Sequence, residues 1–309
     1  MGFQNSNWVC AGTNTTGTIT DIQFSTIDTG FIFGYSDSRP FISGTTDGGY
    51  HWHLVKAFDD SYPGLISFYP ISSAHLLLIR DTLYSSMDGG ITWNKAPAGD
   101  QVFTSSVFQF YFTGPTTGYA ISEGLYRTAD GNHWSLVQPL TPGYDFIQFT
   151  DSLHGFIAGG NVPIPIIQAD VPGYGLLATT TDGGHTWQER IRAPWIDNTQ
   201  NFDAIVGMRF LDNQKGFIAT HNKKLYFTSD GAATFHIVNS NTPAPMNELY
   251  FETAQIGYYL AGNQIYRTAD GGQSFALDFT ASDNLLKIFK GKNAKIFAIG
   301  YNGMVLLRN

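Results

Sequence analysis

The stretch TTDGGHTW, residues 180–187, has the composition of a glycine-rich ligand loop, but it is one copy of a repeated word. Closely similar words occur five more times along the chain. Successive aspartates of these words lie 41, 42, 52, 48 and 40 residues apart, which is the spacing of β-propeller blades. The six aspartates are Asp47, Asp88, Asp130, Asp182, Asp230 and Asp270.

A second landmark counts one more blade than the aspartate words. An aromatic residue at the end of an alternating run is followed six residues later by glycine and another aromatic, as in Phe24 with Gly30. Phe68 and Phe289 also lie six residues before the position where the next run is expected, but the residue at that position is not glycine. With these two positions included, the landmark predicts seven blades.

The two counts differ because the chain ends before a seventh aspartate word could occur. At the other end, residues 1–12 contain Trp8 in a short strand-like run that has no blade of its own. We expect this segment to form the outer strand of the seventh blade, which would close the ring and leave no unpaired edge between the first and last repeats.

The sequence therefore predicts an all-β fold, a seven-bladed β-propeller of four-stranded antiparallel blades in one domain, residues 1–309. Each blade contains four short runs rich in aromatic and β-branched residues, separated by Gly, Asn or Asp. The expected blades are residues 18–57, 65–97, 107–140, 145–192, 205–240, 246–279 and 284–309.

The aspartate word falls between the third and fourth strands of six of the seven blades, where a tight turn needs glycine and a carboxylate can accept backbone hydrogen bonds. A phosphate cradle would need a following helix, and a calcium loop would need several ligands at alternate positions, so we assign the word to structure. Between Asp130 and Trp134 one residue is missing, which predicts a distorted turn. The aromatic residues expected to pack between blades are Trp52, Trp93, Trp134, Trp187, Phe235 and Phe275.

Composition excludes several classes of partner and cofactor. The chain has 25 acidic residues against 17 Lys and Arg, so no basic face is available for nucleic acid or anionic lipid. Cys10 is the single cysteine, which excludes a disulfide framework and a thiolate metal cluster. The histidines include no metal-spaced pair, and no run is apolar enough for a membrane span. We expect no cofactor, no metal, no transmembrane segment and a monomer.

The N-terminal residues MGFQNSNWVC have neither the basic nor the apolar region of a signal peptide. A removed signal peptide would leave a similar start. We expect a periplasmic, extracellular or lipid-anchored location, with the cytoplasm as the alternative.

The pattern Ser/Thr-x-Asp-x-Gly-x-x-Trp/Phe resembles the Asp-box (BNR) repeat. Together with GFIAGGN at 155–161 and IYRTADGG at 265–272, it is similar to the photosystem II assembly and stability factor family of propellers. The resemblance covers the whole chain and implies the propeller fold and a protein-binding scaffold. Asp-box propellers also include sialidases, other glycoside hydrolases and sorting receptors, so the fold does not fix the function.

An enzyme site would have to be built from the charged residues. A sialidase-like site, as the resemblance would require, needs three arginines, but Arg127, Arg267 and Arg308 recur with the repeat, which favours a structural role. Another glycosidase would need two carboxylates roughly 5 to 9.5 Å apart. Most acids fall in connections, where solvation explains them, and the glutamates are only Glu123, Glu189, Glu248 and Glu252. We assign no catalytic residue.

Departures from the repeat point to the functional surface. Residues 161–175 form an insertion between the second and third strands of blade four, and long loops in compact repeats tend to be functional. The insertion should share a face with the linkers between blades, forming an aromatic, proline-rich rim. Ile164, Ile166 and Ile167 could instead fill the channel. The candidate binding residues are Tyr174, Trp195, Asp197, Ile166, Asp59, Asp60, Tyr62 and Arg39.

Two functions remain open at this point. The first is a non-catalytic protein-binding or assembly scaffold that presents the rim, and the second is a glycoside hydrolase or glycan-binding propeller that uses the same rim. An enzyme should have converging carboxylates with raised pKa in a pocket at the channel mouth, whereas a scaffold should have a broad, shallow, partly apolar rim.

Overall fold

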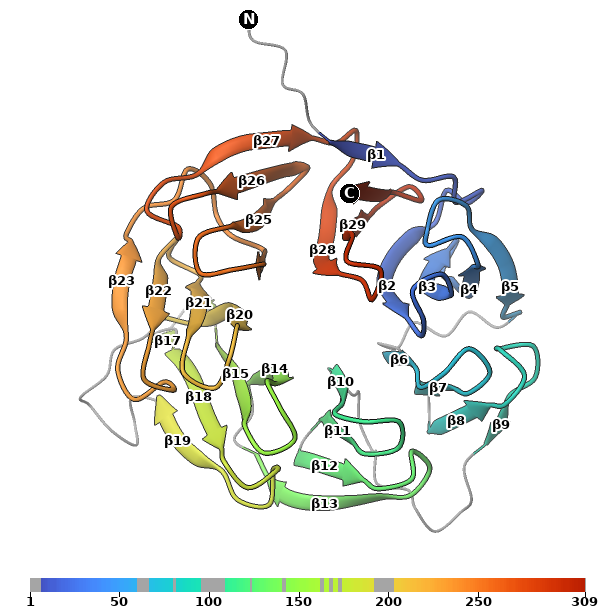
Figure 1. Cartoon of the computed structure of the whole chain (residues 1–309), viewed down its shortest axis with the longest axis horizontal. Helices are drawn as coiled ribbons and strands as arrows, with labels where there is room; N and C mark the ends of the chain where they lie inside the picture. The colour runs from blue at the N-terminus through green and yellow to red at the C-terminus, as the bar shows by residue number, and fades with distance from the viewer. Residues whose placement is uncertain are drawn as a thin grey trace, which may run out of the picture.

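The computed structural model is a ring of seven antiparallel sheets around a central channel, as Figure 1 shows. It describes residues 7–59, 67–79, 82–95, 109–122, 124–140, 143–161, 164–166, 169–171, 174–191 and 203–308. Strands form all of the regular structure in these ranges, so the predicted all-β class is confirmed. The predicted seven blades of four strands are also confirmed.

Blades one to six contribute their strands from the channel outward in chain order, and blade seven takes its outermost strand, β1, from the N-terminus. Blade one consists of β2 (Thr18–Phe24), β3 (Gly30–Ser36), β4 (Arg39–Thr45) and β5 (His53–Ala57). Blade two consists of β6 (Ser67–Pro70), β7 (Leu76–Ile79), β8 (Leu83–Ser86) and β9 (Asn94–Lys95). Blade three consists of β10 (Gln109–Phe112), β11 (Gly118–Ile121), β12 (Gly124–Thr128) and β13 (Trp134–Pro139). Blade four consists of β14 (Tyr144–Phe149), β15 (Gly155–Asn161), β18 (Tyr174–Thr180) and β19 (Gln188–Ile191). Blade five consists of β20 (Ile205–Phe210), β21 (Gly216–Thr220), β22 (Leu225–Thr228) and β23 (His236–Asn239). Blade six consists of β24 (Glu248–Phe251), β25 (Gly257–Ala261), β26 (Gln264–Thr268) and β27 (Ala276–Thr280). Blade seven consists of β28 (Leu285–Lys290), β29 (Ile296–Gly300), β30 (Val305–Arg308) and β1 (Trp8–Cys10).

The N-terminal strand completes the last blade, as predicted. β1 pairs antiparallel with β30, with Trp8 opposite Arg308. Trp8 Nε1 donates a hydrogen bond of 2.8 Å to Asp278 Oδ2 in blade six, and Arg308 forms an ion pair with the same carboxylate. The closing strand is therefore tied both to its own blade and to the preceding one.

The landmark glycines make room for an aromatic ring on the neighbouring strand. Phe24 lies opposite Gly30, and a Cβ atom on Gly30 would come within 2.8 Å of the Phe24 ring. The same arrangement recurs at the other glycine-containing landmarks. In blades two and seven, which lack the glycine, Pro70 and Lys290 occupy this register position, so the assignments of Phe68 and Phe289 to it were wrong.

The aspartate words form hydrogen-bonded turns between the third and fourth strands. In blade four, Thr180 Oγ1 donates to Asp182 Oδ1 at 2.7 Å and accepts from the Gly184 amide at 3.0 Å. The Thr186 amide and hydroxyl both donate to Asp182. Because the turn's own groups occupy this carboxylate, the geometry agrees with a structural role.

The turn of blade three differs, as the missing residue predicts. Asp130 accepts hydrogen bonds from the amides of Asn132 and His133, each one residue earlier than in a complete word. Thr128 Oγ1 accepts from the Gly131 amide and lies 3.2 Å from Asp130 Oδ1. The missing residue therefore shifts the amide donors that follow Asp130 by one position.

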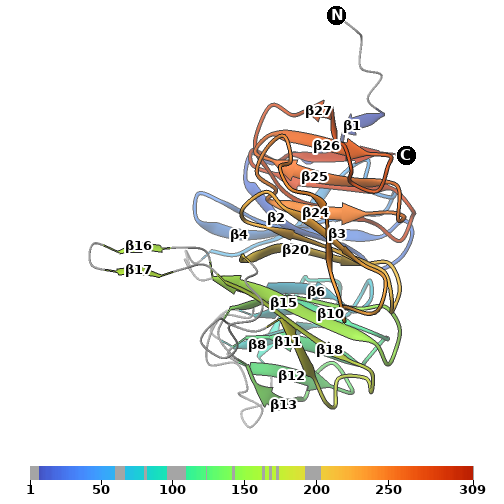
Figure 2. The same cartoon turned by 90° about the vertical axis from the view of Figure 1, so that its left-hand side faces the viewer.

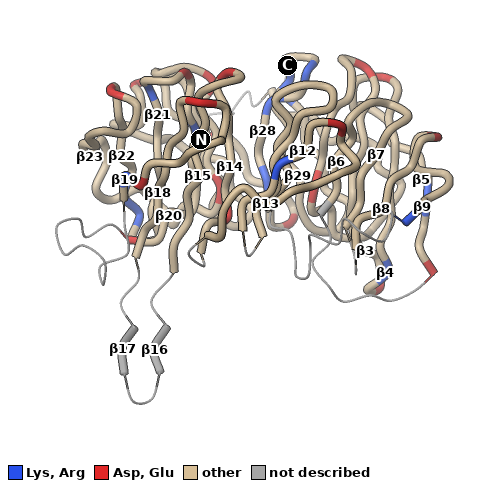
Figure 3. Tube along the Cα trace, turned by 90° about the horizontal axis from the view of Figure 1, so that it is seen from below, with Lys and Arg blue, Asp and Glu red and all other residues tan. Residues whose placement is uncertain are grey.

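The two faces of the ring are distinct. In each antiparallel blade the first and third connections lie on one face, here called the turn face, and in blade four the Gly183 amide of the third connection donates to the Leu153 carbonyl of the first. The second connections and the linkers between blades lie on the other face, here called the insertion face. In the edge-on view of Figure 3, several Asp and Glu segments lie at loop tips on the upper face.

The insertion in blade four contains a small hairpin. β16 (Ile164–Ile166) and β17 (Ala169–Val171) pair antiparallel with Pro165 opposite Asp170, and together they form a separate two-stranded sheet. Figure 2 shows this hairpin projecting away from the ring. The hairpin begins after β15 and ends before β18, so it belongs to the insertion face.

Candidate functional site

The central channel contains a cavity of about 330 Å³ that is lined by the inner strands of all seven blades. Side chains alternate along these strands. Ile22, Leu249 and Ile288 are buried, and among their neighbours along the strands Gln23, Glu248, Tyr250, Lys287 and Phe289 line the cavity. The inner strands thus line the cavity with two layers of side chains.

The layer nearer the insertion face carries a charged arc, defined here as Asp21, Glu248 and Lys287. Each of the three lies three residues before the last residue of its inner strand, and they belong to the neighbouring blades one, six and seven. Lys287 Nζ donates to Asp21 Oδ1 at 2.6 Å. Glu248 and Lys287 line the cavity.

The environment of the arc changes the proton affinity of two of its members. Burial raises the pKa of Glu248 to about 7, and the charge of Lys287 opposes this only in part. Burial acts to lower the pKa of Lys287, but Asp21 and Glu248 outweigh it, so the Lys287 pKa is raised. The arc therefore combines an ion pair with a carboxyl group that is partly protonated near neutral pH.

The second layer contains polar residues that connect the blades. In three blades, the residue before the landmark phenylalanine donates a side-chain hydrogen bond to the backbone carbonyl of the landmark phenylalanine in the next blade. The three pairs are Tyr111 to Phe149, Gln148 to Phe210 and Arg209 to Phe251. The guanidinium of Arg209 also lies 4.9 Å from the centre of the Tyr250 ring. These groups have structural roles, in contrast to Glu248, which receives no side-chain hydrogen bond from any described residue.

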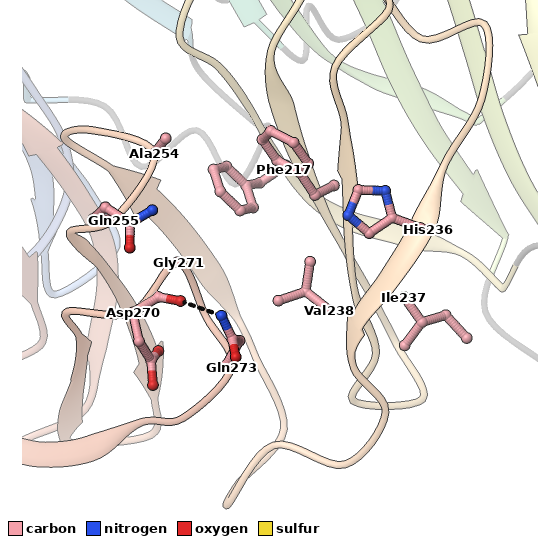
Figure 4. A pocket seen from close by; sticks show the side chains of 10 residues that line it. Phe217, His236, Ile237, Val238, Ala254, Gln255, Asp270, Gly271 and Gln273 are labelled. Carbon is pink, nitrogen blue, oxygen red and sulfur yellow. Dashed lines mark hydrogen bonds between the residues drawn. The ribbon is translucent and has the colours of Figure 1, made fainter.

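A second cavity, of about 420 Å³, lies between blades five and six (Figure 4). Phe217 and Val238 form part of its apolar side, and Asp270 and Gln273 lie opposite them. The Asp270 carboxylate is occupied by Ser274 and by Thr268 of its own turn. This cavity therefore offers no charged group for a ligand comparable to Glu248.

The candidate rim residues divide into three groups. Arg39 and Asp59 are exposed at the insertion face, as expected of a contact surface. Tyr174 is only 8% exposed and packs in the core with Tyr144 and Leu176. It lies in β18 opposite Asn161, inside the sheet, so it supports the insertion and is not an exposed anchor. Asp60, Tyr62, Trp195, Asp197 and the side chain of Ile166 lie outside the described residues.

Sequence reasoning did not identify the charged arc. Glu248 was noted only as one of four glutamates, and Asp21 and Lys287 were not singled out. Aligning the inner strands by their last residues would have placed all three at one level, on three blades that become neighbours when the ring closes.

Within the described part of the chain, no three His, Cys, Asp or Glu side chains gather in a way that could hold a metal ion. The same residues include no helix that is long and apolar enough to cross a membrane.

Comparison with known proteins finds similarity in sequence over part of the chain and similarity in fold over the whole ring. No known protein-family model matches the sequence. The photosystem II assembly lipoprotein Ycf48 of Synechococcus sp. (strain CC9902) is 28% identical over 158 residues, which are 50% of this chain and 42% of that relative. The chain is similar to Ycf48. The match thus spans less than half of the relative's length.

Solved structures extend the likeness to the whole ring. A structure described as YCF48 bound to D1 peptide superposes with a TM-score of 0.73 at 19% identity, covering 99% of this chain and 96% of that one. A GH74 xyloglucanase from Xanthomonas campestris superposes with a TM-score of 0.65 at 14% identity, covering 96% of this chain and 53% of the enzyme. At these identities the superpositions establish the propeller fold alone.

Proposed function

We propose that this chain is a non-catalytic protein-binding scaffold that holds a segment of a partner polypeptide on its insertion face. The observation that carries the proposal is the β16–β17 hairpin, a paired element outside the seven blades that projects from the face where the inner strands begin. It completes no blade, and elements outside a compact repeat commonly contact other molecules, which supports the proposal.

The relatives support this proposal. One protein of the same fold is described as bound to a D1 peptide, and the partial sequence match is named an assembly lipoprotein. By extension we propose a protein partner and an extracytoplasmic location for this chain. We also propose that the aspartate turns are Asp-box repeats and that the closed ring functions as a monomer.

One observation favours a second candidate, a glycan-binding or glycoside-hydrolysing propeller. Glu248, with its raised pKa, lies close enough to Asp21 for their charges to interact, as a pair of catalytic carboxylates would. Asp21 is already engaged by Lys287 at 2.6 Å, which would hinder a role as nucleophile or base. We therefore place this candidate second.

The test replaces residues 162–173 by a two-residue Asn-Gly turn. Asn161 and Tyr174 are already paired, so such a turn can close the β15–β18 hairpin without disturbing the blade. We expect the variant to lose partner binding by about tenfold or more, with unchanged thermal unfolding. The partner is identified by mass spectrometry after affinity capture from the source organism, and its binding is then measured with purified proteins.

Met87→Ser is the matched control, because Met87 is 64% exposed in a turn-face loop. It should leave partner affinity unchanged. Equal binding by the hairpin-deleted variant would contradict the proposal. Hydrolysis of an aryl glycoside that is abolished by Glu248→Gln would favour the second candidate.

A further inference from the structure

Two of the three side chains in the charged arc pair with each other, and the third does not share in that ion pair. Lys287 is engaged by Asp21, whereas the Glu248 carboxyl lines the cavity without a described side-chain hydrogen bond. With all three groups charged, the arc carries one net negative charge, and that charge is located on Glu248. Glu248 is half-buried, and a carboxylate that has lost part of its water without gaining a donor is destabilised, so a cation that reached it would be stabilised.

We propose that the charged arc is a receptor for a basic side chain, a lysine or arginine of the partner polypeptide, which enters the channel from the insertion face and pairs with Glu248. This inference rests on the proposed function for the existence of a polypeptide partner. It adds the chemical identity of the group that the channel recognises.

Position along the strand supports entry from this face. Glu248 is the first residue of β24, and inner strands begin at the insertion face. The hairpin β16–β17 leaves the ring on the same face. A polypeptide held there can therefore direct a long side chain into the channel without crossing the second layer.

The surroundings of Glu248 favour a cation over an anion. The charged groups that act on Glu248 are Lys287 and Asp21, and on its other side β20 presents Gly207 at the same level. Arg209 and Lys290 also line the cavity, but they lie nearer the other end of the inner strands, where Arg209 donates to the Phe251 carbonyl and Lys290 pairs with Glu252. Lys287 is already neutralised by Asp21, so a carboxylate or phosphate would meet the charge of Glu248. Phe146 lines the cavity and offers an apolar surface for the methylene stem of a lysine or arginine.

Binding of a cation should release protons. In the folded protein without a bound cation, the pKa of Glu248 is raised to about 7. An ammonium or guanidinium beside Glu248 favours the ionised form. Affinity should therefore rise with pH through the range in which Glu248 ionises.

The test uses the tripeptide acetyl-Gly-Lys-Gly-amide and its uncharged analogue with norleucine in place of lysine. Calorimetry near pH 7 in two buffers of different ionisation enthalpy measures affinity and proton release. We expect the lysine peptide to bind and release protons, and Glu248→Gln to weaken binding by about tenfold or more and abolish the release.

Glu252→Gln is the matched control. Glu252 is paired with Lys290 at 2.8 Å near the other end of the inner strands, so its neutralisation should leave affinity within about twofold. Lys287→Met should strengthen binding, because it removes the cation that competes for the two carboxylates. This opposite effect tests the proposal even if Glu248→Gln proves unstable.

The outcomes separate the inference from the function on which it rests. Equal binding of the norleucine peptide, or unchanged binding by Glu248→Gln, overturns the inference, and hairpin-dependent capture of a partner would then leave the scaffold function intact. A neutral oligosaccharide that requires Glu248, where the lysine peptide does not, overturns it in favour of a glycan site. Binding of the lysine peptide without any hairpin-dependent partner supports the arc but contradicts the scaffold.

Discussion

The repeat turns and the charged arc both carry carboxylates, yet their proton affinities change in opposite directions. Hydrogen bonds from Thr92 and Ser86 lower the pKa of Asp88 to about 2. Burial without such donors raises the pKa of Glu248 to about 7. The difference teaches that the donors around a carboxylate, and not its residue type, distinguish a structural group from one available to a ligand.

The largest expected effect on stability is at the ring closure. There the Asp278 carboxylate has two partners from blade seven. Asp278→Ala should lower the free energy of unfolding by about 3 kcal/mol, because Trp8 and Arg308 both lose their acceptor. Urea denaturation measures the change. A loss comparable to that of an ordinary surface substitution would show that the closure does not depend on this carboxylate.

A smaller loss is expected at a repeat turn. Asp182→Ala should destabilise the fold by about 1–2 kcal/mol, since the Thr186 amide and the Thr180 hydroxyl lose their acceptor. Partner binding should be unaffected because the turn lies on the face opposite the insertion. If binding disappeared while unfolding stayed the same, the structural interpretation of the aspartate words would fail.

The pH dependence of stability should separate the two kinds of carboxylate. Glu248 has a folded-state pKa of about 7 against 4.5 for the free side chain, so the folded state binds its proton more tightly and loses stability as pH rises between these values. Glu248→Gln should reduce this loss by an amount on the order of 1 kcal/mol. Unfolding free energies at pH 5 and pH 8 for both proteins provide the measurement, and parallel profiles would contradict the raised pKa of Glu248.

The repeat turns should behave in the opposite sense. Asp88, Asp230 and Asp270 have folded-state pKa values of about 2, below the ordinary 3.8, so their contribution to stability is present above about pH 4 and is lost as pH falls toward 2.

The smallest expected effect on stability is at the exposed rim. Arg39→Ala and Asp59→Asn should change the free energy of unfolding by less than about 0.5 kcal/mol, because both side chains are exposed. If the rim contacts the partner, the same variants weaken partner binding in a purified assay. Unchanged binding by the double variant would confine recognition to the hairpin and the channel.

Local chemistry made much of the fold predictable. The Ser or Thr, Asp and Gly of each repeat word interact within one turn, and the word therefore identifies its own structure wherever it occurs. The residue missing before Trp134 likewise predicted the altered turn of blade three. Tyr174 was placed incorrectly because its burial depends on the packing of blade four, which the linear sequence of the insertion does not reveal.

The sequence by itself determined the number of blades and the turns that end the third strands of blades one to six, because short-range patterns repeated at a fixed spacing encode them. The closure by the N-terminal strand followed from the mismatch between six aspartate words and seven blades. Only the tertiary structure decided that Asp21, Lys287 and Glu248 form one site. Asp21 lies near the start of the chain and the other two near its end, and they meet because the ring brings blade one beside blade seven. Their proton affinities depend on that closure, since burial and the distances between charges exist only in the assembled channel.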